Sequence, residues 1–230
     1  MFSDIKKEKN IFKDYKLLLE FLLLNMHNEQ TKENIENYVK LDSLVYDDKD
    51  KMRNDFYKKK TIIQKLFFFE INKHYYCKNC KNRDYSKYFI NCVLEFELGI
   101  IKEDITIYNL FNSLSQKKEC KKCNKNKFRS KLKLNSCPLY LIIIIKNKEE
   151  HQLNYNFNHN EKIDLKDYVT GDNHNLNEYY LVSFIKNPPI EKEKKNGVIY
   201  CKSPVNNEWY KYEGIKCEKK NIKDIIKEEK

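Results

Sequence analysis

The chain has 230 residues, of which 40% are hydrophobic and 13% aromatic, so it can form a folded core and is not a disordered chain. Its formal net charge is +11, but lysine occurs along the whole chain and is interrupted by Asp and Glu, which disfavours a nucleic-acid-binding surface. The charged first ten residues exclude a signal-peptide pattern, and the longest apolar runs, 17–24 and 139–145, are too short to cross a bilayer.

The first half of the chain predicts helices and then strands. Residues 11–28 predict one amphipathic helix, because apolar side chains recur at helical spacing with charged ones between them. These apolar side chains are Phe12, Tyr15, Leu18, Leu19, Leu22 and Leu23. The polar stretch 31–60 predicts a loop with short helical pieces. Strand-like sequence follows at 62–69, 75–76 and 88–98, and residues 106–114 predict a short helix.

Strands dominate the second half. Residues 128–134 predict a strand, and the seven consecutive apolar residues 139–145 predict a fully buried central one. Residues 147–160 are polar and predict a loop, and 163–169 form a short, partly apolar segment. Three further strands are predicted at 179–185, 197–202 and 207–212, and a terminal helix at 221–229. The chain therefore predicts an α+β fold.

Two Cys-x-x-Cys pairs carry the clearest chemical signal. Cys77 and Cys80 form the first pair, and Cys120 and Cys123 form the second, about forty residues later. Two such turns can place four thiolates around one Zn²⁺ ion and leave no position open for a substrate, so a structural zinc site is predicted. Disulfides or free thiols are the alternatives. Paired cysteines without a secretion signal indicate a reducing, cytoplasmic or nuclear compartment.

In this order, the motifs resemble those of the ubiquitin-specific proteases, the papain-like enzymes that cut ubiquitin from proteins. The helix with Asp14 and Glu20-Phe21-Leu22 is similar to an early helix of the family, and the cysteine pairs are similar to its zinc site. The strand 136–146 resembles one that usually ends in Leu-Lys-Arg-Phe, of which Lys146 alone is kept. The segments 180–185, 197–202 and 209–213 resemble the family's last strands.

The resemblance implies a fold and a domain organisation. We expect residues 1–230 to form one domain of the family, with zinc-bearing β fingers on a β palm. Residues 11–60 would be the remaining thumb helices, 61–135 the fingers and 136–230 the palm. The first part of the thumb, which holds the family's nucleophile in a Gly-Asn-x-Cys box, is expected to lie outside this chain.

The resemblance also implies an incomplete catalytic apparatus. The family's base lies in a Gly-His-Tyr motif, and Gly197 is followed here by Val198 and Ile199. Valine cannot accept a proton. Glu213 stands where the family has the acid that orients the base. No catalytic residue is therefore expected in this chain.

The remaining cysteines and histidines offer no clear substitute. We expect Cys92, Cys137, Cys201 and Cys217 to behave as small hydrophobic side chains. We expect His27, His74, His151, His159 and His174 to lie in loops or on the surface.

Three functions are left open. The favoured one is a catalytically inactive family member that binds ubiquitin or another protein, within a complex and without a membrane. The alternative is the C-terminal portion of an active cysteine-type deubiquitinase whose Cys box lies outside this chain. The third is a basic structural or RNA-associated protein that reuses the frame, and salt-dependent RNA binding would favour it.

Overall fold

The computed structural model describes residues 15–31, 45–56, 58, 60–81, 83–98, 106–113, 117–118, 120, 122–124, 128–147, 162–170, 177–186 and 197–228. The chain divides into two compact units. Unit 1 comprises Met1–Phe96, Phe111–Lys146 and Leu165–Asn177, and unit 2 comprises Glu97–Leu110, Asn147–Asp164 and Glu178–Lys230. The helices and strands confirm the mixed α+β class.

The first helix, α2 (Tyr15–Thr31), is predicted correctly as a helix, but its buried face overlaps the predicted apolar stripe only in part. Its buried row is Glu20, Leu23 and His27, whereas Leu22 is 45% exposed and Met26 47% exposed. Residues three and four apart share a helix face, so this row packs inward, together with Leu19 of the predicted stripe, which contacts the same buried cluster. Lys16 places its Nζ 3.6 Å from the Glu20 carboxylate, which offsets part of the cost of burying that charge.

His27 is buried, so the expectation of a surface histidine is wrong at this position. Its Nδ1 lies 2.7 Å from the Thr61 hydroxyl, and its ring stacks on Phe56 with centroids 5.3 Å apart. His74 is partly buried in β2 (Phe69–Cys77), and His151, His159 and His174 lie outside the described residues.

Residues 62–67 form helix α4 (Ile62–Phe67), so the strand predicted there is wrong. Thr61 caps this helix, because its hydroxyl accepts a hydrogen bond from the Gln64 N–H at 3.1 Å. In a short apolar run, periodicity does not distinguish a helix from a strand. Here the Thr61 cap favours the helix. The expected helical piece before it is confirmed as α3 (Lys49–Phe56), and the later short helix as α5 (Ile107–Ser113).

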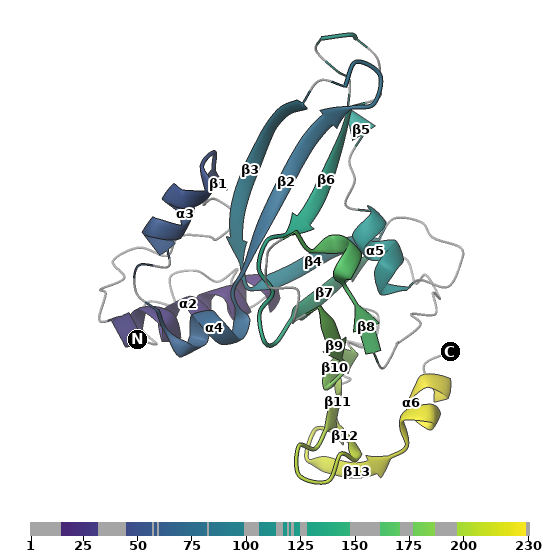
Figure 1. Cartoon of the computed structure of the whole chain (residues 1–230). Coiled ribbons are helices and arrows are strands. Elements are labelled where there is room, and N and C mark those ends of the chain that lie inside the picture. The colour runs from purple at the N-terminus through teal and green to yellow at the C-terminus, as the bar shows by residue number, and fades with distance from the viewer. Residues whose placement is uncertain are drawn as a thin grey trace. The chain divides into compact units, whose positions relative to one another are not determined.

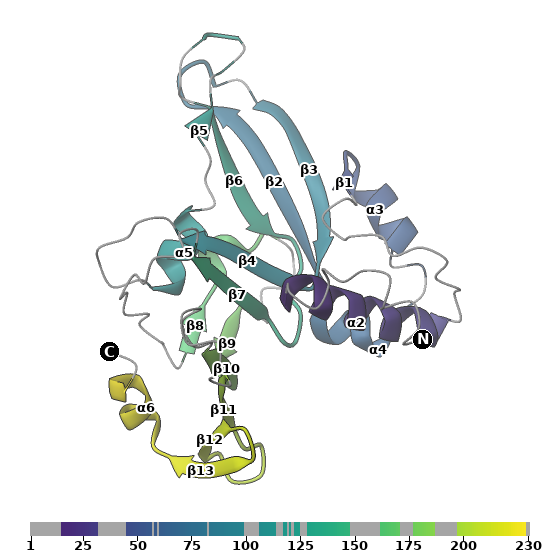
Figure 2. The same cartoon turned by 180° about the vertical axis from the view of Figure 1, so that it is seen from behind.

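The main sheet of unit 1 has the strand order β1-β3-β2-β6-β5 and is antiparallel. Figures 1 and 2 show β2 between β3 and β6, the long strands of this sheet. The other members are β1 (Val45–Tyr46), β3 (Arg83–Asn91), β5 (Lys117–Lys118) and β6 (Phe128–Leu134). Arg53 of α3 anchors the start of β2 through three hydrogen bonds of 3.0–3.2 Å to the buried Glu70 carboxylate.

The isoleucine-rich strand is shorter and less buried than predicted. It is β7 (Ile142–Asn147), and it pairs with β4 (Val93–Leu98) in a two-stranded sheet. Leu139 is 42% exposed and Tyr140 51% exposed, while Ile142–Ile145 are half-buried. The Tyr140 N–H donates to the Leu66 carbonyl at 2.8 Å, so this part of the run connects to α4 and does not extend the strand. The prediction of a fully buried central strand is therefore wrong.

Unit 2 contains a four-stranded antiparallel sheet in the order β10-β11-β12-β13. Its strands are β10 (Ser183–Lys186), β11 (Val198–Lys202), β12 (Trp209–Glu213) and β13 (Lys216–Lys220), and α6 (Ile222–Glu228) follows. The core of the unit consists of Tyr200, Trp209 and Ile225, and Phe184 stacks on Tyr200 at 4.6 Å.

The predicted terminal helix is confirmed in α6, which begins after Asn221. The Asn221 Oδ1 accepts a hydrogen bond from the Lys223 N–H at 2.9 Å, as a helix cap does. The strand predicted at 179–185 is instead divided into β9 (Glu178–Tyr180) and β10, and β9 pairs with β8 (Lys162–Asp164). A 3₁₀ turn, η3, covers Lys166–Tyr168.

Thr61→Ala should destabilise the chain by about 2 kcal/mol, because it removes the cap of α4 and the hydrogen bond to His27. The check is the midpoint of urea unfolding, followed by circular dichroism, at unchanged m-value. Thr61→Ser keeps the hydroxyl and should unfold like the original chain. Equal midpoints for the alanine and serine variants would contradict the role of the cap.

Candidate metal centre

The two Cys-x-x-Cys segments form tight turns. Cys77 ends β2, and Lys81 has a φ of 53°, so the chain reverses into β3 through a left-handed residue. After the second pair, Asn124 has a φ of 49°, and its N–H donates to the Cys120 carbonyl at 2.7 Å. Asparagine tolerates the left-handed region better than most residues, which suits this position.

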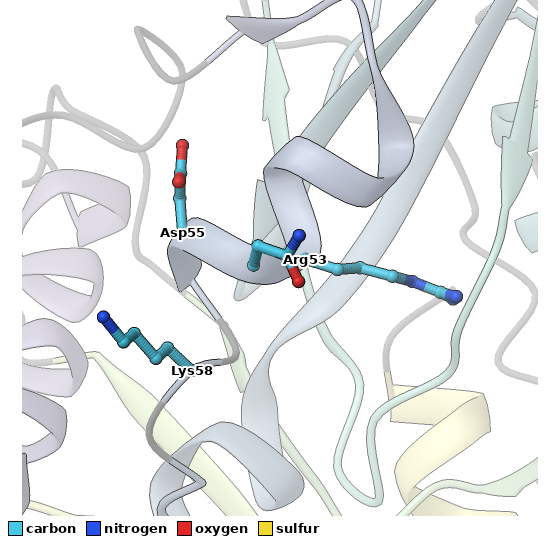
Figure 3. A pocket seen from close by; sticks show the side chains of 4 residues that line it. Arg53, Asp55 and Lys58 are labelled. Atoms are coloured by element: carbon cyan, nitrogen blue, oxygen red, sulfur yellow. The ribbon is translucent and has the colours of Figure 1, made fainter.

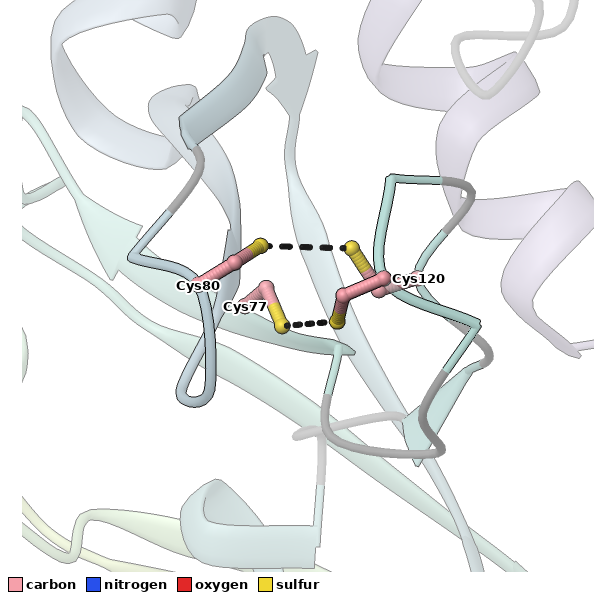
Figure 4. Close-up of side chains that lie close together, drawn as sticks. Cys77, Cys80 and Cys120 are labelled. Atoms are coloured by element: carbon pink, nitrogen blue, oxygen red, sulfur yellow. Dashed lines mark hydrogen bonds between the residues drawn. The ribbon is translucent and has the colours of Figure 1, made fainter.

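The four cysteines meet in space, as the sequence predicts. Their sulfur atoms all lie within 4.8 Å of one another. Cys77 Sγ is 3.6 Å from Cys123 Sγ, and Cys80 Sγ is 3.7 Å from Cys120 Sγ (Figure 4). A disulfide needs about 2.05 Å, whereas sulfurs on a tetrahedral ion at about 2.3 Å lie about 3.8 Å apart. The spacing therefore fits a four-thiolate metal site, and none of the eight cysteines is in a disulfide.

The local environment favours thiolates. A hydrogen bond from the Cys80 backbone N–H, the largest effect, lowers the pKa of Cys77 to about 6. Cys77 and Cys120 are each 1% exposed, and among the described residues the buried cluster at this end of the sheet consists of the four cysteines. A closed set of four sulfur ligands holds an ion without an open position, so such an ion would stabilise the fold and would not activate water.

The positions that resemble the family's base and acid lie directly opposite each other. Val198 of β11 and Glu213 of β12 are paired in register. Val198 is half-buried against the core of unit 2, and the exposed Glu213 lies 3.3 Å from the Lys211 Nζ. The pair thus consists of an aliphatic side chain and a carboxylate that already has a cation beside it.

The other cysteines differ among themselves. Cys92 is fully buried, as expected for a small hydrophobic side chain, and Cys137 and Cys201 are half-buried. Cys201 Sγ lies 3.3 Å from the Ser183 hydroxyl. Cys217 is exposed, so the expectation is wrong there, and its hydrogen bond with Tyr212 raises the pKa of that phenol.

The two described histidines, His27 and His74, both belong to unit 1, whereas Cys201 and Cys217 belong to unit 2. Within the described part of unit 2, therefore, neither thiol has a histidine beside it. The described part of unit 2 therefore offers no Cys–His pair that could replace the family's catalytic pair.

A hollow of about 560 Å³ beside α3 is lined by Arg53, Asn54, Asp55 and Lys58. Figure 3 shows the Arg53 side chain pointing away from Asp55 and Lys58. The Arg53 guanidinium is engaged by Glu70 instead. These side chains do not converge on one point, so the hollow has the character of a solvated surface and not of a binding site.

The chain resembles several solved structures. It matches a structure of the SAGA DUB module of Ubp8, Sgf11, Sus1 and Sgf73 at 15% identity and a TM-score of 0.66, over 91% of this chain and 47% of that chain. A structure of the module bound to monoubiquitin matches at 15% identity and 0.58, over 77% and 44%. A yeast SAGA structure matches at 16% and 0.58, over 79% and 43%. These matches show the fold, and this chain spans less than half of each solved chain.

The sequence comparisons are more direct. No curated protein sequence matches the chain. Among the described residues, no helix combines the length and the apolar character needed to cross a membrane. The sequence model described as ubiquitin carboxyl-terminal hydrolase matches residues 1–229. Because this match extends over nearly all of its length, the chain belongs to the ubiquitin carboxyl-terminal hydrolase family.

Proposed function

We propose that this chain binds ubiquitin, or a protein that carries it, and does not cleave ubiquitin conjugates. The absence of cleavage is proposed because the strand register sets Val198 opposite Glu213. A base and the acid that orients it must be hydrogen-bonding neighbours, and these two positions are neighbours. Ubiquitin binding is supported by family membership and by the similarity to a module solved with monoubiquitin.

Loss of the base has a clear chemical consequence. A thiol nucleophile reacts as the thiolate, which the histidine of such enzymes generates and stabilises. Valine at position 198 offers no lone pair, and general-base catalysis is typically worth about 10²–10⁴ in rate. The chain would keep the surface that binds a partner while the chemical step is blocked.

The alternative is that the chain is the C-terminal portion of an active deubiquitinase with its Cys box elsewhere. The coverage of 47% of the solved chain favours it, because the rest of that chain has no counterpart here. Val198 counts against it, since adding a nucleophile does not add a base. We therefore retain the binding function as the better supported one.

The ion that suits the four-cysteine cluster is Zn²⁺, which prefers tetrahedral sulfur ligands. Cys77, Cys80, Cys120 and Cys123 would hold it and so close the end of the sheet. Thiolates remain reduced in the cytoplasm and nucleus, so either compartment fits this site.

Purified chain should contain one Zn²⁺, with Zn–S distances of about 2.3 Å by X-ray absorption. Cys120→Ser should lose most of the metal, because an alcohol is a far weaker ligand than a thiolate. Cys217→Ser changes an exposed cysteine outside the cluster and should keep a full zinc ion. A folded chain without metal, or equal zinc content in both variants, would rule out the assignment.

The chain should bind ubiquitin in a calorimetric or NMR titration, and should neither turn over a fluorogenic ubiquitin substrate nor react with a thiol-trapping ubiquitin probe. Val198→His should not restore turnover, because histidine alone supplies no nucleophile. A probe adduct on any cysteine, or turnover abolished by Cys201→Ala, would show a relocated site.

An activity assay on a longer chain that includes a Gly-Asn-x-Cys segment distinguishes the two candidate functions. If Val198 has replaced the base, that chain should turn over substrate only after Val198→His. Turnover with Val198 intact would favour the active deubiquitinase and contradict our proposal.

A further inference from the structure

The positive charge of this chain is concentrated in one place. Residues 71–91 and 117–134, which contain β2 from Ile71 onward, β3, β5, β6 and both cysteine pairs, include fourteen Lys or Arg and only two Asp or Glu among 39 residues. The remaining 191 residues include 31 Lys or Arg and 32 Asp or Glu, and are therefore almost neutral. The expectation of lysine evenly interrupted by acids is wrong for these two segments.

A lysine-rich composition does not account for this pattern. The rest of the chain is also rich in lysine, but there nearly equal numbers of acidic residues balance it. What distinguishes the two segments is the near absence of acids.

A tetrathiolate zinc site does not account for the charge either. Four thiolates and one Zn²⁺ ion carry a net charge of about −2, which two cations balance. The two segments carry a surplus of twelve positive charges. Most of that surplus has no counter-charge at the cysteine cluster.

The strand register places several of these cations in rows across the sheet. Tyr76 of β2 is in register with Arg83 of β3 and Arg129 of β6, and Arg129 is in register with Lys117 of β5. In the backbone register, Tyr76 therefore stands between two arginine positions.

The neighbouring row on the same face continues the pattern. His74 lies two residues before Tyr76 on β2, and it is in register with Lys131 of β6. On the opposite face Lys73 is in register with Lys87. At the cysteine turns, Lys78, Lys81 and Lys122 are exposed. A polyanion laid along this end of the sheet would contact these three exposed lysines.

We infer that this basic finger, formed by β2, β3, β5, β6 and the described parts of the cysteine turns, binds single-stranded nucleic acid. Lysine is a point charge that contacts phosphates without selecting bases. Half-buried Tyr76 and His74 are in register with arginine and lysine positions and offer rings on which bases stack, as in sequence-tolerant single-strand binding. An acidic protein would use the lysines but would gain little from these rings.

The test is fluorescence anisotropy with a fluorescein-labelled 30-nucleotide oligo(U), using zinc-loaded chain between 50 and 200 mM salt. We compare the triple variant Lys78→Gln, Lys81→Gln, Lys122→Gln with a control, Lys51→Gln, Lys216→Gln, Lys223→Gln. Both change three exposed lysines and the net charge equally. The finger variant should bind about a hundredfold more weakly at 0.1 M salt, and the slope of log affinity against log salt should fall by about 2. The control should bind within about threefold of the original chain.

A second pair of variants tests stacking. Tyr76→Ala should weaken oligo(U) binding by roughly tenfold or more, and Tyr76→Phe, which keeps the ring, should not. Circular dichroism and zinc content establish that each variant is folded. Loss of binding by Tyr76→Phe equal to that by Tyr76→Ala would overturn the stacking role.

Two competitors separate the sources of negative charge. A 30-residue polyglutamate that competes as well as oligo(U) would assign the finger to acidic proteins and overturn the inference. Duplex DNA that binds more tightly than oligo(U) would overturn the single-strand preference. Equal binding by the finger and control triple variants would overturn the site. Ubiquitin binding is independent of all these outcomes.

Discussion

Four sulfur atoms meet at the end of a sheet, where they form the buried cluster among the described residues. Cys77 and Cys80 come from one turn, and Cys120 and Cys123 from another about forty residues later. An ion bound to all four would close that long loop and lower the entropy of the alternative conformations, as a crosslink does. It would also hold the paired ends of β2 and β6 in register.

The sequence predicts best where one local signal decides the outcome. The cysteine pairs have few other structural uses, and α5 and α6 have clear helical periodicity, so all three predictions agree with the structure. The predicted strand at 62–69 fails because the Thr61 cap, a single side-chain contact, outweighs an ambiguous apolar run. Strand β13 has no apolar alternation, and its pairing with β12, invisible in the sequence, forms it.

Burial is harder to predict because it depends on partners distant in the chain. His27 is buried because Thr61, 34 residues away, supplies a hydrogen bond and Phe56 supplies a stacking surface. Tyr140 lies in an apolar run but is exposed, because its backbone is held by α4. Periodicity identifies which residues share a face, but it does not identify which face another element covers.

Position 198 joins a good structural fit to a side chain that cannot accept a proton. Val198 suits its place structurally, since a β-branched side chain favours a strand and packs against the half-buried edge of the Tyr200 and Trp209 core. A histidine there would need a hydrogen-bonding partner, and Glu213, the residue in register, already lies beside Lys211. Each of these two side chains therefore makes its contacts without the other.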